Sequence, residues 1–346
     1  MDPISHGVVG AVCASLPTSQ RREELRTAVI VGGVAALLPD LDVLIRSSQD
    51  PLLKLEYHRH FTHALAFVPI GAAIAWLLTL PLLRLVRAAP VSHSRLYLYA
   101  LLGYGTHGFL DAATSYGTQL LWPFSAERIA WSIIGIVDPL FTVTIAVLLF
   151  AAIAKRSALL CKAALVFGLC YLSLGLIQRQ RAEQHATKVA LESGVRLSSR
   201  QCEAKPSPLT LTLWRAICET EDDRFITSAW YLGPFGGVRQ YPGVSTPKFS
   251  LERDAPWLQA GTRQHRDLQR FDWFSSGFIT LHPEHDNVVG DLRYSMLPDR
   301  ISPLWGIVLD PHDLRQERPT PFQSFRSIKD RDFATFLAMA RGTALP

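Results

Sequence analysis

The chain has 346 residues and a formal net charge of +5, and 48% of its residues are hydrophobic. The charge is small and no dense block of lysine and arginine is present, so a nucleic-acid-binding protein is not expected. The five cysteines form no CxxC pair, which argues against a zinc ribbon or a disulfide framework, although Cys202 and Cys218 could pair in an extracytoplasmic domain.

The apolar residues are concentrated in the first half of the chain. Residues 1–178 are largely apolar with few charges, whereas the remainder has the mixed charge of a soluble protein. We therefore predict a mainly α protein, in which a polytopic membrane domain of about four to six apolar helices precedes a small antiparallel β-rich C-terminal domain. The predicted boundaries are 1–192 for the membrane domain, 193–207 for a linker and 208–346 for the soluble domain.

Six apolar segments are candidates for membrane helices. Residues 3–16 follow an Asp-Pro helix start but are short for a membrane span. Pro39 should break the helix within the second segment, 27–45, so it is open whether these first two cross the membrane completely. The four clearer segments are 64–86, 96–113, 133–154 and 157–177, the last continuing as a polar helix to about residue 191.

Histidines and aspartates gather at the ends of these apolar segments. The sequence HRHFTH at 58–63 places three histidines directly before one apolar run, and Asp40 and Asp42 lie inside another. His107 and Asp111 are four residues apart, so both side chains point from one helix face. Ionisable groups in a membrane helix are costly and functional by default, and neutral imidazole is the commonest protein metal ligand. The pattern therefore predicts a metal site.

The basic residues predict that these polar groups share one side of the membrane. The positive-inside rule places the loops 21–26, 84–95 and 155–156 in the cytoplasm, although Arg179 and Arg181 argue mildly for the reverse. Alternating segments then bring the following residues to or near the opposite face, with His107 about one turn deeper: His6, Asp40, Asp42, His58, His63, Asp111 and Asp138. We expect one site in the cytoplasmic membrane, with the site and the C-terminal domain on the extracytoplasmic face.

The donor types suggest the cation and its chemistry. Nitrogen and oxygen donors together suit one or two divalent ions, with zinc the first choice and manganese or iron as alternatives. A site of this kind would activate water for hydrolysis, and Asp42 or Asp111 would serve as the base. Membrane lipid is the expected surrounding of the site, and a lipid-linked or amphiphilic substrate follows from that location.

Several neighbouring side chains have two readings each. Thr62, Thr114 and Ser115 offer hydroxyls that would contact a ligand or the substrate. For Thr114 and Ser115, a simple polar loop is equally consistent with the sequence. Asp138 precedes a proline, so metal ligation and helix capping are about even there. His60 is expected to face solvent or to contact a ligand.

From about residue 205 the pattern changes to short runs rich in β-branched and aromatic residues. The candidate strands are 209–217, 224–231, 273–281, 288–294 and 303–309, separated by breaks rich in proline and glycine. They predict a small antiparallel sheet. His282 and His285 lie between two of these runs beside Pro283, which favours an exposed hairpin loop over a second metal site.

These residues also resemble a known family, the YdjM-type inner-membrane-associated metal-dependent hydrolases. The matching pieces lie in about the first 180 residues and are 5–7, 38–42, 58–63, 107–111 and 114–118. The resemblance implies a membrane-embedded helical core and a hydrolase activity. The metal ligands that it implies are His6, Asp40, Asp42, His58, His63, His107 and Asp111. This chain has His60 and Ala64 where the family usually has a small residue and a serine, so any substrate contact by that serine is missing.

Two kinds of function are consistent with this pattern. The first is a membrane-bound metal-dependent hydrolase that cleaves an ester or phosphoester bond. The second is a non-catalytic membrane protein, either a transporter or a metal-stabilised scaffold. Transporters often combine repeated halves with broken helices, whereas this chain has broken helices and no internal repeat. Bound metal that is lost together with turnover would favour the hydrolase.

Overall fold

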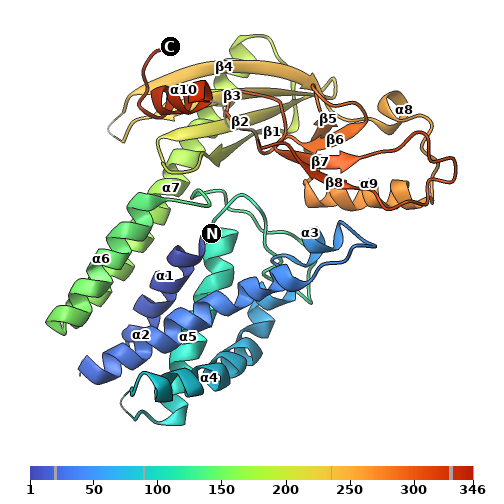
Figure 1. The fold of residues 1–346 in the computed structure, drawn as a ribbon. Coiled ribbons are helices and arrows are strands. Elements are labelled where there is room, and N and C mark those ends of the chain that lie inside the picture. The colour runs from blue at the N-terminus through green and yellow to red at the C-terminus, as the bar shows by residue number, and fades with distance from the viewer. Residues whose placement is uncertain (19–21, 89, 235, 327–329, 346) are drawn as a thin grey trace. The chain divides into compact units, whose positions relative to one another are not determined.

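The structure is a computed structural model that describes residues 1–18, 22–88, 90–234, 236–326 and 330–345. It contains helices in the N-terminal part of the chain and antiparallel sheets in the C-terminal part (Figure 1), as the sequence predicts. The chain divides into two compact units, which we describe separately. The first unit comprises Met1–Leu44, Tyr57–Leu176 and Pro208–Thr210, and the second comprises Ile45–Glu56, Ile177–Ser207 and Leu211–Pro346.

The helices of the N-terminal part begin where the sequence supplies caps and prolines. Asp2 caps α1 by accepting from the Ser5 amide at 3.0 Å, and Asp138 caps α6 by accepting from the Phe141 amide at 3.1 Å. The helices are α1 (Pro3–Ser15), α2 (Arg22–Leu37), η1 (Leu38–Leu44), α3 (Leu53–Tyr57), η2 (Phe61–His63), η3 (Leu65–Phe67), α4 (Val68–Leu85), α5 (His93–Ala112), α6 (Pro139–Lys155) and α7 (Ala158–Glu192).

Three described helical stretches are long and apolar enough to cross a membrane. They are Glu23–Leu44, Leu65–Leu85 and Ala158–Glu192, and the first of them contains the predicted break, because α2 gives way to the 3-10 helix η1 just before Pro39. Helices α1 and α6 are apolar but shorter. The predicted polar connection 21–26 is instead helical from Arg22 onward, while Arg21 lies outside the described residues.

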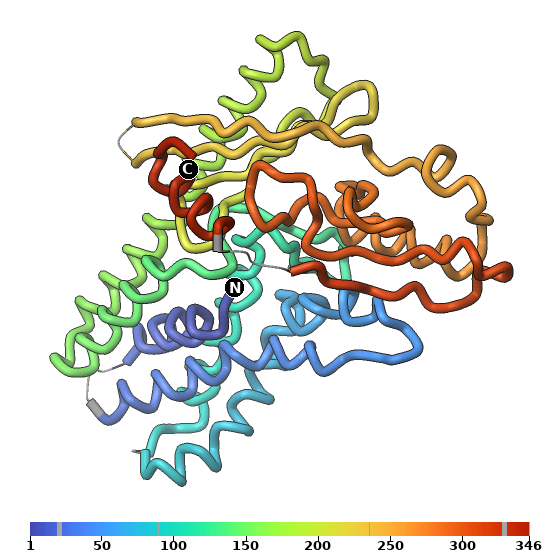
Figure 2. The backbone as a smooth tube through the Cα atoms, turned by 45° about the horizontal axis from the view of Figure 1, so that its top comes forward, coloured from blue at the N-terminus to red at the C-terminus, as the bar shows by residue number. Residues whose placement is uncertain are grey.

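Glycines set the spacing of α1, α2 and α5, which pack against one another (Figure 2). A Cβ atom on Gly103 of α5 would lie 2.2 Å from the carbonyl oxygen of Gly32 in α2. A Cβ atom on Gly32 would in turn lie 2.7 Å from the carbonyl oxygen of Gly10 in α1. Small residues therefore let three backbones approach closely, as is common between membrane helices.

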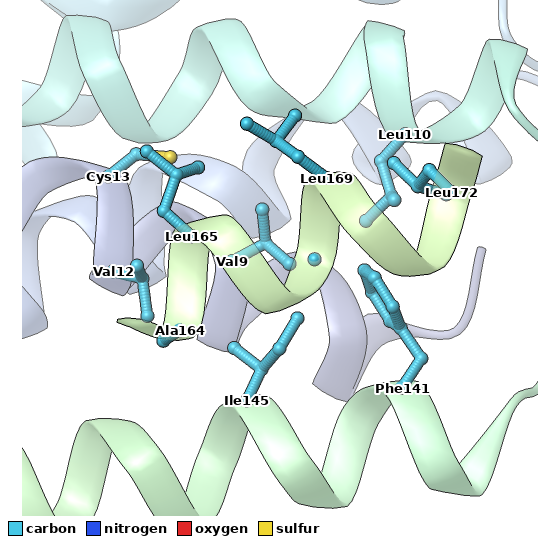
Figure 3. Close-up of a pocket in the computed structure, with 11 residues that line it drawn as sticks. Val9, Val12, Cys13, Leu110, Phe141, Ile145, Ala164, Leu165, Leu169 and Leu172 are labelled. Carbon is cyan, nitrogen blue, oxygen red and sulfur yellow. The ribbon is translucent and has the colours of Figure 1, made fainter. Parts of the chain in front are cut away.

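An apolar cavity of about 80 Å³ lies between α1, α5, α6 and α7 in the first unit (Figure 3). Val9, Leu110, Ile145 and Leu169 each contribute from a different one of these helices. The cavity exposes only apolar surface.

The second unit contains two four-stranded antiparallel sheets where the sequence predicts one small sheet. The strand orders are β1-β2-β3-β4 and β5-β6-β7-β8. The first sheet is formed by β1 (Leu197–Pro206), β2 (Leu213–Thr220), β3 (Arg224–Leu232) and β4 (Val238–Pro247), and the second by β5 (Ile279–Leu281), β6 (Val288–Asp291), β7 (Trp305–Val308) and β8 (Phe322–Ser324). Helices α8 (Leu251–Asp254), α9 (Arg263–Phe274) and α10 (Asp330–Ala340) accompany them.

Two sequence expectations differ from the structure of this unit. Residues 197–206 form strand β1 within the stretch expected to be a linker, because they pair with β2 and a disulfide joins Cys202 to Cys218 across the two strands. The expected strand 273–281 begins in α9, and only its last three residues form β5. The aromatic residues at its start are also compatible with a helix that buries one face, which pattern alone does not distinguish from a strand.

Gly103→Ala tests the close approach of α2 and α5. We expect it to lower the free energy of unfolding by about 1–3 kcal/mol, because the added methyl group meets backbone rather than a movable side chain. Gly105→Ala is the matched control on the same helix, since its Cβ would lie 3.7 Å from Val68. Thermal unfolding in detergent should separate the two variants, and equal melting temperatures would contradict the packing described above.

Candidate metal centre

Two overlapping groups of donor side chains lie in the first unit. Asp40, His63, His107 and Asp111 form the deep group, and Asp40, Asp42 and His58 form the outer group. Within each group, one donor atom from every residue lies within 4.8 Å of the others. The donors come from η1, η2, α5 and the segment between α3 and η2. Residues that are far apart in sequence therefore converge, as the sequence predicts for this set.

The deep group presents two imidazole nitrogens and two carboxylates to one point. The Nε2 atoms of His63 and His107 are 3.0 Å apart. Asp111 Oδ2 lies 3.2 Å from the first of these nitrogens and 3.5 Å from the second, and Asp40 Oδ1 lies 3.7 and 3.5 Å from them. His63, His107 and Asp111 are buried, whereas the side chain of Asp40 is 27% exposed.

Hydrogen bonds orient both histidine rings of the deep group. His107 Nδ1 donates to the Ala36 carbonyl oxygen at 2.6 Å, because a carbonyl can only accept. In the neutral ring, the lone pair of Nε2 then faces the cluster, which is the tautomer that a metal ligand requires. The other ring, His63, has its Nδ1 3.0 Å from Thr62 Oγ1 and 3.3 Å from Asp42 Oδ2.

The 3-10 helix η1 gives the two carboxylates different partners. Asp40 contacts the two histidines of the deep group, while Asp42 lies 2.9 Å from His58 Nδ1 through Oδ1. The Arg59 amide donates to Asp42 Oδ2 at 2.7 Å. Asp42 is buried, so its negative charge depends on these partners. The 3-10 helix η1 thus contributes Asp40 to both donor groups and Asp42 to the outer group.

His6 and Arg59 lie beside the donor groups. His6 Nε2 is 3.1 Å from Asp111 Oδ1, and its ring stacks on His107 with centroids 3.7 Å apart. Arg59 is a residue that the sequence reasoning missed: its Nε lies 3.0 Å from Asp111 Oδ2 and its Nη1 donates to Thr114 Oγ1 at 2.7 Å. Its position between two histidines of HRHFTH was the available signal. The Met1 amino group also contacts Asp111.

The remaining predicted side chains fall into three places. Thr62 donates to Asp42, and Thr114 donates to the Asp111 carbonyl at 2.8 Å. Ser115, which follows Thr114, is buried. Asp138 accepts from the Tyr171 hydroxyl in addition to capping α6, and it belongs to neither donor group. His60 lies against Trp122 at 5.4 Å between ring centroids and is likewise outside both groups.

The histidines of the second unit form no part of this centre. His282 and His285 lie in the connection between β5 and β6, as the sequence predicts for a hairpin loop, but His282 is buried rather than exposed because its ring packs against Phe325. Their rings pack 4.5 Å apart and both contact Phe325.

The residues present fit a divalent cation. Asp111 Oδ2 is buried and accepts no hydrogen bond from any described residue, even though Arg59 Nε is close. A buried carboxylate oxygen that accepts no well-aligned hydrogen bond costs free energy even beside a positive charge, and a cation among the four donors would satisfy it. The set of imidazole and carboxylate donors matches zinc, manganese or iron. The Nε2 lone pair of His107 already faces that position.

Comparisons with known proteins agree with a membrane assignment. The family model described as YdjM inner membrane protein matches residues 1–182. The protein named "Uncharacterized protein YfhP" from Bacillus subtilis (strain 168) is 27% identical over 144 residues, which is 40% of this chain and 42% of that protein. The matched region thus spans less than half the length of this relative. No solved structure matches the chain.

His63→Ala tests the deep group. We expect bound metal to fall by at least about tenfold, because the variant removes a nitrogen donor that Thr62 and Asp42 hold in place. His60→Ala is the matched control, since it removes an imidazole from the same motif but from outside both donor groups. Metal content of the purified proteins decides the outcome, and equal losses in the two variants would contradict the assignment.

Proposed function

We propose that this chain, which belongs to the YdjM inner membrane protein family, is a membrane-bound metal-dependent hydrolase of ester or phosphoester bonds. The observation that carries the proposal is the pair of donor groups that share Asp40, buried among apolar helices. A divalent cation bound there would supply the acidification of a water molecule and the polarisation of a substrate oxygen. Zinc is the first choice for the donors present.

Asp42 is the better placed of the two candidate bases. It lies 2.9 Å from His58 Nδ1, and the His58 side chain is 26% exposed, so a proton taken by the carboxylate has a route to solvent. Asp111 is fully buried and paired with Arg59, which suits it to holding a cation rather than to moving a proton. Asp40, the partly exposed member of the deep group, lies where a substrate would enter.

The location of the site supports an amphiphilic or lipid-linked substrate. The apolar cavity of Figure 3 is lined by Leu110, the neighbour of Asp111, and by Val9, which follows His6 by about one helical turn. A hydrocarbon chain is the occupant that such a lining favours inside a membrane. The polar end of the same molecule would then face the donor groups.

We also propose that the site and the second unit lie on the extracytoplasmic face. The Cys202–Cys218 disulfide supports this orientation, because disulfides persist in oxidising compartments and are rare in the cytosol. The basic loops at 84–95 and 155–156 support it independently through the positive-inside rule. The alternative function, a metal-stabilised scaffold or a transporter, is favoured by one observation, the almost complete burial of His63, His107 and Asp111.

Turnover and metal content together separate the enzyme from the scaffold. We expect the purified, zinc-loaded protein to hydrolyse at least one member of a panel of phosphoester, ester and amide amphiphiles. Asp111→Ala should lose metal and turnover together, whereas Asp42→Asn should lower kcat by about 100-fold or more because it removes the proposed base. Metal retained by the wild type with no hydrolysis of any compound would refute the enzyme and support the scaffold.

Thiol labelling tests the proposed orientation. In a variant in which the three free cysteines Cys13, Cys161 and Cys170 are replaced by serine, a membrane-impermeant reductant and thiol reagent should label Cys202 and Cys218 in intact cells. Ser157→Cys, with the disulfide cysteines also replaced, is the control for the opposite face. It should react only after the cells are permeabilised. Labelling of the control in intact cells would reverse the topology.

A further inference from the structure

We propose that Arg270 of α9 is a positioning residue for the outer donor group, acting through the segment of chain that joins Asp42 to His58. The inference rests on the metal centre proposed above. It assigns to the second unit a role in setting the geometry of ligands that belong to the first unit.

The segment Ile45–Glu56, here called the bridging segment, belongs to the second unit, while the residues on both sides of it belong to the first. The chain therefore leaves the donor cluster shortly after Asp42 and returns to it at His58. These two side chains meet at 2.9 Å. The two ends of the bridging segment are therefore held close together. A displacement of the segment would displace Asp42 and His58 at its ends.

Arg270 holds the bridging segment through two carboxylates. Its guanidinium forms a bidentate pair with Asp50, at 3.0 and 2.9 Å, and its Nε donates to Glu56 Oε1 at 2.5 Å. Bidentate arginine–carboxylate pairs are among the strongest and most directional contacts in proteins. Burial opposes ionisation of Asp50, but the hydrogen bonds from the guanidinium outweigh it and hold the pKa of Asp50 below its ordinary value.

Two further contacts fix the same segment. Arg263, two helical turns before Arg270 on α9, donates to the Gln49 carbonyl oxygen at 2.6 Å. The Lys54 ammonium lies 4.5 Å from the centre of the Phe322 ring. The segment is thus contacted by α9 and by strand β8, and each contact belongs to the second unit.

The Arg270 guanidinium is also held in place by its own helix. Arg270 Nη1 donates to Asp267 Oδ1 at 2.8 Å, and the buried Asp267 also accepts from the Thr320 amide at 3.1 Å. Phe271 and Phe274 anchor the same helix, because both side chains are almost fully buried. Arg270 therefore presents its remaining donors to the bridging segment from a rigid support.

The contacts of Arg270 lie only a few residues along the chain from the outer group. Glu56 precedes His58 by two residues and Arg59 by three, and these two residues hold Asp42 through an imidazole and a backbone amide. The deep group draws His107 and Asp111 from α5, far along the chain from the bridging segment, but it shares Asp40 with the outer group. Asp42 also contacts His63 and Arg59 also contacts Asp111, so the two groups are coupled. Loss of Arg270 should therefore disturb the outer group more than the deep one.

Arg270→Ala in the full chain is the decisive variant. We expect amide hydrogen exchange at Arg59 to accelerate by about tenfold or more. Without Arg270 the chain before Arg59 is held less firmly, so the hydrogen bond from the Arg59 amide to Asp42 opens more often. In zinc titrations, affinity at the outer group should fall by at least about tenfold, while affinity at the deep group should fall by a clearly smaller factor. Arg266→Ala is the matched control, since Arg266 is on the same helix, 57% exposed, and paired with Glu317 instead.

Two more variants test the mechanism of the effect. Arg270→Lys keeps the charge but loses the bidentate geometry, so its exchange rate and zinc affinity should lie between those of the wild type and the alanine variant. Asp50→Asn alone should accelerate exchange at Arg59 and lower the zinc affinity of the outer group. It should add little to Arg270→Ala, because the two changes break the same contact. Fully additive effects would show that they act separately.

The outcomes keep this inference distinct from the proposed hydrolase. Unchanged exchange at Arg59 in folded Arg270→Ala overturns the positioning role, whether or not the protein hydrolyses anything. Equal loss of zinc at both groups also overturns it, because it points to a general loss of folding. If the wild type binds no zinc, the proposed function fails, and the exchange measurement still decides the role of Arg270.

Discussion

The structure depends on negative charge that is buried among apolar helices. Asp111 and Asp42 are both almost fully removed from solvent, and an isolated carboxylate in such surroundings is strongly disfavoured. Histidines, the Arg59 guanidinium and a backbone amide surround them, yet one oxygen of Asp111 still accepts no hydrogen bond from the described residues. A divalent cation bound there, as we propose, would compensate the charge and accept the Nε2 lone pair of His107.

Close backbone packing makes this arrangement possible. Glycines at 10, 32 and 103 bring α1, α2 and α5 together, and these helices carry or precede His6, Asp40 and His107. The Ala36 carbonyl that orients the His107 ring lies one helical turn after Gly32. The spacing of the helices and the orientation of the ligands are therefore two consequences of the same contacts.

The bridging segment is the part of the chain through which the second unit would affect the proposed metal centre. It leaves the helical unit between two metal-ligand candidates and is held by arginines of α9. Because Asp42 is both a donor candidate and the proposed base, a small displacement of this segment would alter cation affinity and proton transfer together. Arg270 thus holds the segment of chain that joins two residues of the outer donor group.

The sequence by itself determined the class of the fold, and it predicted every residue of the two donor groups. Long apolar runs, helix-starting prolines and ionisable residues at their ends predicted the helical part, and the β-branched runs predicted sheets. Tertiary structure alone decided that Arg59 contacts Asp111, that Asp138 caps α6 outside both donor groups, and that residues 197–206 form a strand. It also decided that 45–56 belongs to the second unit. These features depend on partners distant in the chain, whereas periodicity and capping report only on local neighbours.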